Sequence, residues 1–170
     1  MKNISKKDIS YLSLFSAITI CGNIFETIIP KPYPFLRIGI ANIPILILIY
    51  HKKYYFALFT TLSKSIITPI ILGIIFTIQP LISLFASLCA FLFMVFAKQF
   101  IKGLSIIGVS ILGALTSNMM QIYLVYLFIF RTTSIYKLVS PFILLSILSG
   151  SLTGIFAIKL KRVLPIKKIV

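Results

Sequence analysis

The stretch Pro30–Asn42, PKPYPFLRIGIAN, determines how the chain is organised, because it separates two long apolar runs. Each proline fixes its own φ at about −65° and biases the residue before it away from the helical region. We therefore expect the first helix to end at Pro30 and the next helix to begin only after Pro34. This places Arg37 and Asn42 in the first turns of the second helix, close to the end of the helix that carries Glu26.

Two blocks of the sequence carry a family resemblance. Glu26–Asn42 reads ETIIPKPYPFLRIGIAN and Ser105–Gln121 reads SIIGVSILGALTSNMMQ, with weaker matches at Ser83–Met94 and Pro141–Gly154. Together they resemble the heptaprenyl diphosphate synthase component I family, also called Gx transporters, over nearly the whole chain. The resemblance implies a fold like the S components of energy-coupling-factor transporters, with a transmembrane coupling subunit and ATPase subunits as partners. The family's enzyme name instead implies a soluble prenyl diphosphate synthase as the partner.

The composition is that of a membrane protein. Of the 170 residues, 59% are hydrophobic and 11% are charged, whereas a soluble domain carries about 25% charged residues. The formal net charge of +15 arises from 17 Lys and Arg residues against only Asp8 and Glu26. These basic residues form short clusters between apolar runs, which is typical of cytoplasmic membrane flanks and not of nucleic-acid binding. Cys21 and Cys89 lie within apolar runs and indicate neither a disulfide nor a metal site.

The apolar runs predict an all-α fold, an integral membrane six-helix bundle that forms a single transmembrane domain over residues 1–170. By resemblance this bundle is S-component-like. A membrane-spanning helix needs about 20 apolar residues, and the first run is too long for a signal peptide. The second run is short and carries Pro44, which suits a buried position beside a cavity. The expected spans cover about residues 9–29, 36–50, 54–77, 80–97, 104–130 and 138–160.

Six spans place both termini on the same side of the membrane. Twelve Lys and Arg residues lie on that side, and Lys64 lies within the third span. The opposite side carries Lys31, Arg37, Arg131 and Lys137. The positive-inside rule therefore predicts a multi-pass protein of the bacterial plasma membrane with cytoplasmic N- and C-termini and the proline-rich loop outside.

Polar residues within the spans predict a substrate site, because a charge in hydrocarbon is costly and normally faces a cavity. Arg37 can pair with Glu26, or it can donate to an anionic ligand while Glu26 orients it or closes the loop. Lys64 can be solvated by backbone carbonyls and hydroxyls, or by an anionic group of a ligand. Two amides spaced three residues apart on the fifth span can bind a neighbouring helix or a ligand. The predicted substrate-binding residues are Glu26, Arg37, Asn42, Lys64, Asn118 and Gln121.

Small residues predict close helix packing in two places. Ser13, Ala17 and Cys21 recur every four residues on the first span, which lets another helix approach closely. This stripe either packs within the chain or docks a partner, as the first helix does in the S components that the chain resembles. The later small residues are also expected to be close-packing positions and not a nucleotide loop; they are Gly108, Gly113, Ala114, Ser117, Gly150 and Gly154.

Autonomous catalysis is not expected. The sequence has neither a GxGxxG motif nor a P-loop pattern, so it cannot be its own ATPase. Prenyl diphosphate synthases hold magnesium with aspartate-rich clusters, which Asp8 and Glu26 cannot supply. No catalytic residue, metal or cofactor is therefore predicted.

Two functions remain for the chain. The first is a membrane substrate-binding subunit that takes up a small, anionic or polar solute and is surrounded by membrane lipid. The second is a non-catalytic membrane subunit of heptaprenyl diphosphate synthase in isoprenoid-quinone synthesis. The two functions differ in their partners, which are a coupling subunit with ATPases in the first case and a soluble synthase in the second.

Overall fold

The computed structural model describes residues 6–30, 36–101, 103–130 and 137–163. The described part of the chain is all-α, as the sequence predicts. A 3₁₀ turn (Ile40–Asn42) precedes the second helix, and a π turn (Tyr126–Phe130) follows the fifth. Its six α-helices are α1 (Lys6–Ile28), α2 (Ile43–Tyr50), α3 (Tyr54–Ile71), α4 (Ile78–Phe100), α5 (Ile106–Val125) and α6 (Val139–Val163).

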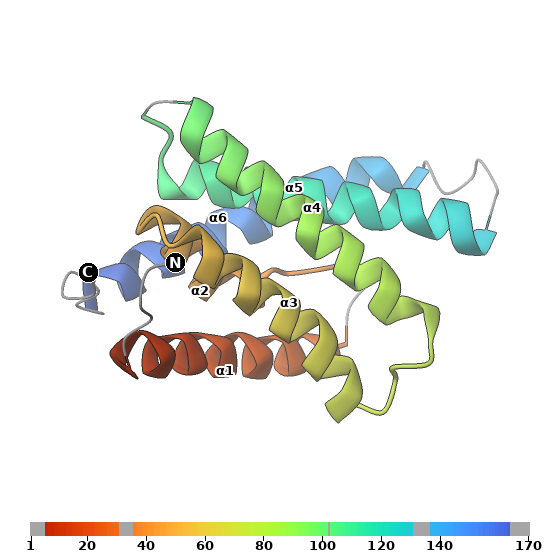
Figure 1. Ribbon diagram of the computed structural model, residues 1–170. Helices are drawn as coiled ribbons and strands as arrows, with labels where there is room; N and C mark the ends of the chain where they lie inside the picture. The colour runs from red at the N-terminus through yellow and green to blue at the C-terminus, as the bar shows by residue number, and fades with distance from the viewer. Residues whose placement is uncertain (1–5, 31–35, 102, 131–136, 164–170) are drawn as a thin grey trace.

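The short helix α2 lies at the centre and contacts each of the other five helices. Figure 1 shows α1 and α3 on one side of it, with α4, α5 and α6 on the other. Ile45, Ile47 and Ile49 of α2 are almost completely buried, so this helix forms the core of the bundle. A helix that is apolar on all sides is stable only when other elements enclose it.

Four of the described helices are long and apolar enough to cross a membrane: Ile9–Ile28, Ile78–Phe100, Ile106–Ile129 and Val139–Arg162. This finding supports a multi-pass membrane protein. The second and third helices are shorter than the spans that the sequence predicts. Helix α2 covers only Ile43–Tyr50, and α3 ends at Ile71 instead of Thr77. At about 1.5 Å per residue, α2 cannot cross a bilayer core of about 30 Å alone.

The predicted start of the second helix is wrong, and two residues explain why. Gly39 adopts a left-handed backbone conformation with φ of 88°, which helical residues cannot share. Pro44 lies in the first turn of α2, where its missing N–H costs nothing. The residues from Leu36 to Gly39 are therefore not helical, and Arg37 lies in an irregular segment before the helix instead of in its first turns.

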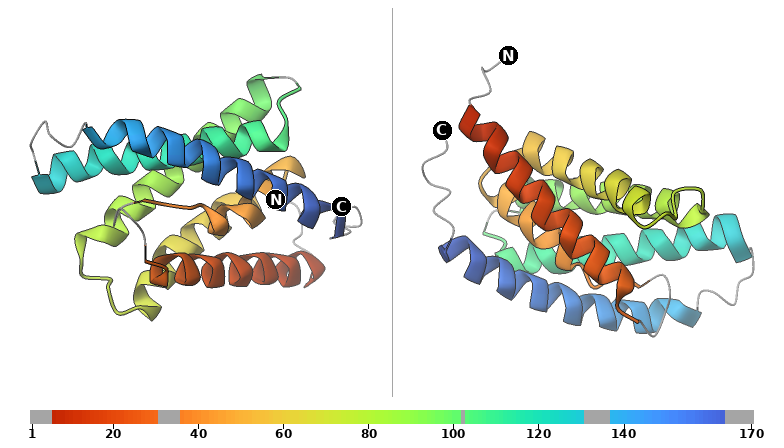
Figure 2. Two further views of the ribbon diagram at one scale, coloured as in Figure 1. Left: turned by 180° about the vertical axis from the view of Figure 1, so that it is seen from behind. Right: turned by 90° about the horizontal axis from the view of Figure 1, so that it is seen from below.

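Helices α5 and α6 run antiparallel and lie side by side (Figure 2). Their close approach depends on two of the predicted packing glycines. A Cβ added to Gly150 would lie 2.7 Å from the Cα of Ile111, and one added to Gly154 would lie 2.7 Å from the Cα of Ile107. Both glycines therefore lie directly against the backbone of α5, which is how small residues bring membrane helices together.

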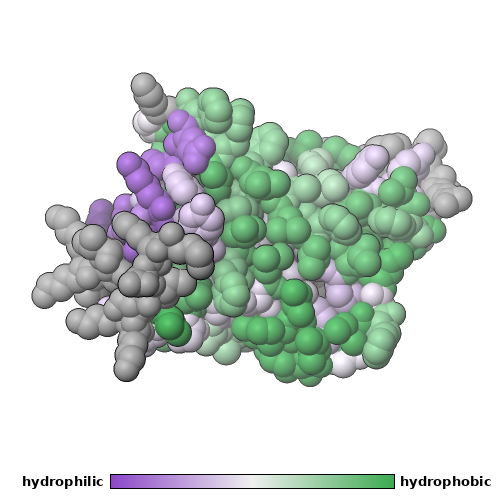
Figure 3. Space-filling view, in the orientation of Figure 1, coloured by the Kyte–Doolittle hydropathy of each residue, from purple (hydrophilic) through white to green (hydrophobic). Residues whose placement is uncertain are grey.

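Basic residues gather at the end where α1 begins and α6 ends (Figure 3). The ring of Tyr50 joins three helices there, with Lys98 Nζ 4.1 Å and Lys161 Nζ 5.4 Å from its centroid. The rest of the visible face is largely hydrophobic, as expected for a surface in contact with lipid. Residues 31–35 and 131–136, which carry Lys31 and Arg131, lie outside the described residues, so the orientation in the membrane stays a prediction.

The C-terminus of α2 closes with two backbone hydrogen bonds, Lys53 N–H to Leu48 and Lys52 N–H to Ile49. This is a Schellman motif, but Lys52 occupies the left-handed position that usually holds glycine, with φ of 58°. His51 lies beside it with a buried Nε2 that has no hydrogen-bond partner in the described part of the chain. Burial, together with the charges of Lys161 and Lys53, lowers the pKa of His51.

Candidate functional site

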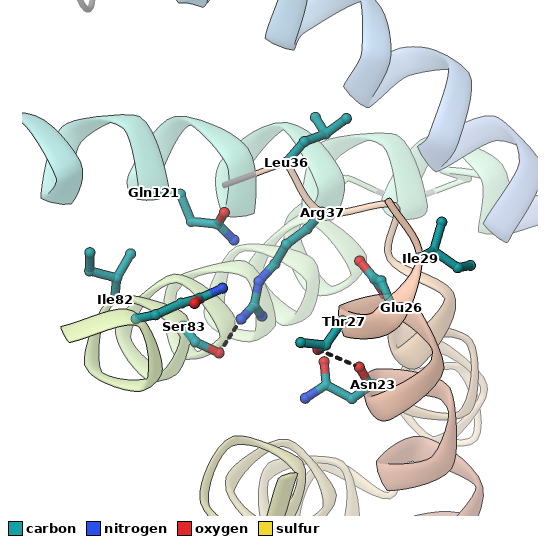
Figure 4. A pocket seen from close by; sticks show the side chains of 10 residues that line it. Asn23, Glu26, Thr27, Ile29, Leu36, Arg37, Ile82, Ser83 and Gln121 are labelled. Atoms are coloured by element: carbon teal, nitrogen blue, oxygen red, sulfur yellow. Dashed lines mark hydrogen bonds between the residues drawn. The ribbon is translucent and has the colours of Figure 1, made fainter. Parts of the chain in front are cut away.

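A cavity of about 260 Å³ lies at the end of the bundle opposite the basic cluster. The end of α1, the irregular segment before α2, the first turns of α4 and the middle of α5 form its walls (Figure 4). Most of its side chains are polar, although three apolar residues complete the wall. Its lining consists of Asn23, Glu26, Thr27, Ile29, Leu36, Arg37, Gln79, Ile82, Ser83 and Gln121.

The Arg37 side chain reaches across this cavity toward α4 (Figure 4). Its guanidinium donates hydrogen bonds to Ser87 Oγ at 2.9 Å and to Ser83 Oγ. Both acceptors are neutral hydroxyls, so they hold the guanidinium in place without cancelling its charge. The arrangement therefore fixes the guanidinium in a cavity that Glu26 also lines.

Glu26 is only 4% exposed and binds the backbone of the segment that carries Arg37. Its Oε1 accepts hydrogen bonds from the N–H of Ile38 at 2.6 Å and from the N–H of Gly39 at 3.0 Å. Bonds from backbone amides to a carboxylate are charge-assisted and strong. Glu26 thus anchors this segment to α1, and it also lines the cavity. Closing this segment is one of the roles that the sequence allows for Glu26.

Asn118 holds the same segment from the other side. Its Oδ1 accepts from the N–H of Arg37 at 3.1 Å, and its Nδ2 lies 3.4 Å from the Arg37 carbonyl. The same Nδ2 donates to Ser146 Oγ of α6 at 2.8 Å. Asn118 therefore fixes the Arg37 backbone against α5 and α6 but is not among the residues that line the cavity. Gln121, one turn later, is 3% exposed and does line it.

Lys64 and Asn42 form a separate pair. Lys64 is 2% exposed, and its ammonium group donates to Asn42 Oδ1 at 2.5 Å. The carbonyl of Lys64 accepts the Asn23 amide at 3.5 Å. Neither Lys64 nor Asn42 lines the cavity, so the structure separates the six predicted residues into three cavity residues, one backbone clamp and one internal pair.

Sequence reasoning missed five polar residues at or beside the cavity: Asn23, Thr27, Gln79, Ser83 and Ser87. Three of these residues had a signal in the sequence. Ser83 and Ser87 are spaced one helical turn apart within an apolar run, in the block that weakly resembles the family. Gln79 precedes Pro80 at the start of α4 and reads as a turn marker from sequence alone. Only the packing of α4 against the Arg37 segment shows that these residues share a site.

The small-residue stripe faces outward. Ser13, Ala17 and Cys21 are all exposed on α1, so packing of the stripe within the described chain is excluded. An exposed stripe remains open to a partner or to lipid, and docking therefore stays a prediction.

These features define a class of protein: an all-α membrane protein whose bundle carries a half-open polar cavity lined by an arginine and a glutamate. Residues 15–160 match the family described as heptaprenyl diphosphate synthase component I, and the chain belongs to this family. Component I is a subunit of the synthase and is not itself catalytic, in agreement with the sequence-based expectation. No curated protein and no solved structure matches the chain. Among the described residues, no cluster of His, Cys, Asp and Glu could hold a metal ion.

Proposed function

We propose that this chain is the non-catalytic membrane subunit of a heptaprenyl diphosphate synthase. The family match over residues 15–160 carries this proposal, and the four apolar helices are compatible with it. A heptaprenyl chain partitions strongly into lipid, because each buried CH₂ contributes about 0.8 kcal/mol. A membrane subunit that holds the catalytic subunit at the bilayer lets the product enter lipid directly instead of crossing water.

Co-purification with the catalytic subunit tests this function. We expect a soluble prenyl diphosphate synthase to co-purify with the tagged chain from detergent-solubilised membranes. We also expect formation of heptaprenyl diphosphate to fall when the chain is removed and to return when it is added back. A synthase with the same activity and product length in the absence of the chain would contradict the proposal.

The half-open polar cavity favours a second candidate, a substrate-binding subunit for uptake of a small anionic or polar solute. At about 260 Å³ the cavity is below the range of about 300–1,000 Å³ that holds drug-sized ligands. It is therefore too small for a whole heptaprenyl chain, and it suits a small solute or the headgroup of a larger one. In this function the partners are a transmembrane coupling subunit and ATPase subunits.

The same co-purification separates the two candidates. ATPase and coupling subunits recovered with the chain would support uptake, whereas a prenyl synthase would support the membrane-subunit function. Native mass spectrometry of the chain released from detergent adds a second readout, because a transported solute would remain bound to the isolated chain. Uptake would be contradicted if the isolated chain carried no small solute and no ATPase subunit co-purified.

A further inference from the structure

Two lysines from different helices meet at one aromatic ring, at the end of the bundle where α1 begins and α6 ends. The Nζ atoms of Lys98 on α4 and Lys161 on α6 lie 4.1 Å and 5.4 Å from the centroid of the Tyr50 ring. A ring attracts a cation within about 6 Å of its centroid. The Tyr50 hydroxyl donates to the Leu104 carbonyl at 2.8 Å, which holds the ring in place. The ring therefore brings together two like charges that lie far apart in the sequence.

The depth and the burial of these lysines set them apart from ordinary flanking lysines. Lys98 and Lys161 lie in the last turns of helices that are long and apolar enough to cross a membrane, which corresponds to the level of the lipid headgroups. Both are half-buried, as is Lys53, whose Nζ lies 5.6 Å from the centroid of the Phe56 ring. Lys159, also on α6, is exposed instead. The members of this group, the Tyr50 cluster, are Tyr50, Lys53, Lys98 and Lys161.

The Tyr50 cluster carries an excess of positive charge. Glu26 is the only acidic residue whose side chain the structure describes, and it lies near the opposite end of α1. The sequence holds one further acidic residue, Asp8 on α1, and one carboxylate cannot balance three lysines. Burial, together with the charges of Lys161 and Lys53, lowers the pKa of His51, which favours its neutral form beside them. Because groups of one charge sign concentrate ions of the opposite sign, the cluster attracts an anion.

We propose that the Tyr50 cluster is a binding site for a phosphate group, held between the ammonium groups of Lys98 and Lys161. Lysine binds phosphate through charge-assisted hydrogen bonds, and basic pockets between membrane helices bind phosphate-bearing headgroups. Two sources supply this chemistry at the end of the bundle: the headgroup of an anionic lipid and a free diphosphate. The site lies at the opposite end of the bundle from the polar cavity, and it is independent of both candidate functions.

The test is a titration of the purified full chain in neutral detergent at constant ionic strength. The probes are inorganic diphosphate and dihexanoyl phosphatidylglycerol, with the net-neutral dihexanoyl phosphatidylcholine as the control for the lipid tails. We expect saturable binding of at least one anionic probe, with an affinity that falls as the salt concentration is raised. Tighter binding of phosphatidylglycerol would assign the site to a lipid headgroup, and tighter binding of diphosphate to a free phosphate. Failure of both anionic probes to saturate the chain would overturn the proposal.

Two matched variants on α6 distinguish a site from general charge attraction. Lys161→Gln and Lys159→Gln each remove one positive charge from the same end of α6, but only Lys161 contacts the Tyr50 ring in the described part of the chain. Lys161→Gln should weaken anion binding about fivefold, which corresponds to about 1 kcal/mol for one basic residue at the membrane surface. Lys159→Gln should change the affinity by less than about twofold. Equal losses in the two variants would overturn the site.

A pair of changes at Lys98 provides an independent readout. Lys98→Arg keeps the charge over the Tyr50 ring, so its anion affinity should stay within about twofold of the wild type. Lys98→Gln should lose about fivefold in affinity, as Lys161→Gln does. The melting temperature of each variant without a probe shows whether the chain is folded. Wild-type affinity in a folded Lys98→Gln chain would contradict the role of Lys98 and overturn the site.

Discussion

Replacing Gly150 with alanine should force α6 away from α5. The new Cβ would lie 2.7 Å from the Cα of Ile111 and 3.2 Å from the Cβ of Ala114. Carbon atoms in contact prefer separations of about 3.5–4.0 Å, so the two backbones must separate by roughly 1 Å. A backbone atom cannot rotate out of the way, and the strain therefore spreads along the whole helix pair.

The expected loss of stability follows from two opposing terms. Overpacking costs about 1–3 kcal/mol, and the better helix propensity of alanine returns up to about 1 kcal/mol. Gly150→Ala should thus lower the free energy of unfolding by about 1–2 kcal/mol, and Gly154→Ala should do the same against Ile107. Because both changes push the same helix pair apart, the double variant should lose less than the sum of the two. Reversible unfolding of the detergent-solubilised chain, followed by near-ultraviolet circular dichroism, measures these differences.

Gly113→Ala is the matched control on α5. Its added Cβ would meet the side chain of Met94, at 2.6 Å from Sδ and 2.7 Å from Cγ, and not a backbone. Met94 is buried, but its flexible side chain can shift where a backbone cannot, so we expect a smaller loss than at Gly150. A loss at Gly113 equal to that at Gly150, or no loss at Gly150, would refute the argument that backbone contact sets the cost.

Four further predictions follow from single residues. Lys52→Gly should raise the unfolding free energy by about 1 kcal/mol in denaturant titrations, because it relieves the left-handed strain at the end of α2. The lowered pKa of His51 favours its neutral form in the fold, so stability should be constant above about pH 6.5 and should fall as the pH drops below that value; His51→Gln should flatten this melting profile. Ala17→Trp on the exposed stripe should abolish co-purification of the partner while leaving the melting temperature of the isolated chain unchanged, and survival of every partner complex would show that the stripe does not dock. Lys64→Met should lower the free energy of unfolding by about 1 kcal/mol in denaturant titrations, because it removes the donor to Asn42 Oδ1; an unchanged free energy would show that this bond does not stabilise the fold.

The fold was predictable from the sequence wherever a long run of apolar residues determines a helix. The long apolar runs at about residues 9–29, 80–97, 104–130 and 138–160 determine α1, α4, α5 and α6, and the observed bounds lie within a few residues of the prediction. The predicted start of the second helix was wrong because it depends on the backbone conformation of one residue. The sequence shows that Gly39 can adopt a positive φ but not that it does. The third span was predicted too long, since the residues after Ile71 are apolar and yet form turns before α4 begins.

The candidate site was predictable in part, for a related reason. Glu26, Arg37 and Gln121 were selected as polar residues in apolar surroundings, and all three line the cavity. The same rule also selected Asn118, which binds backbone instead. Side-chain polarity identifies groups that need a partner, but it does not distinguish a ligand from a backbone amide, since both satisfy the same hydrogen-bonding requirement.

The groups that bind Glu26, Arg37 and Lys64 therefore depend on the irregular segment before α2. Pairing Glu26 with Arg37 by sequence leaves Lys64 as the uncompensated charge, and a ligand is then expected at Lys64. In the structure, the left-handed turn at Gly39 directs two backbone amides at Glu26, and the carboxylate bonds those amides. The guanidinium is held by serines, and the ammonium group of Lys64 is held by Asn42. A glycine without a side chain thus determines that Glu26 bonds the backbone of the segment that carries Arg37, while the serines of α4 hold the guanidinium.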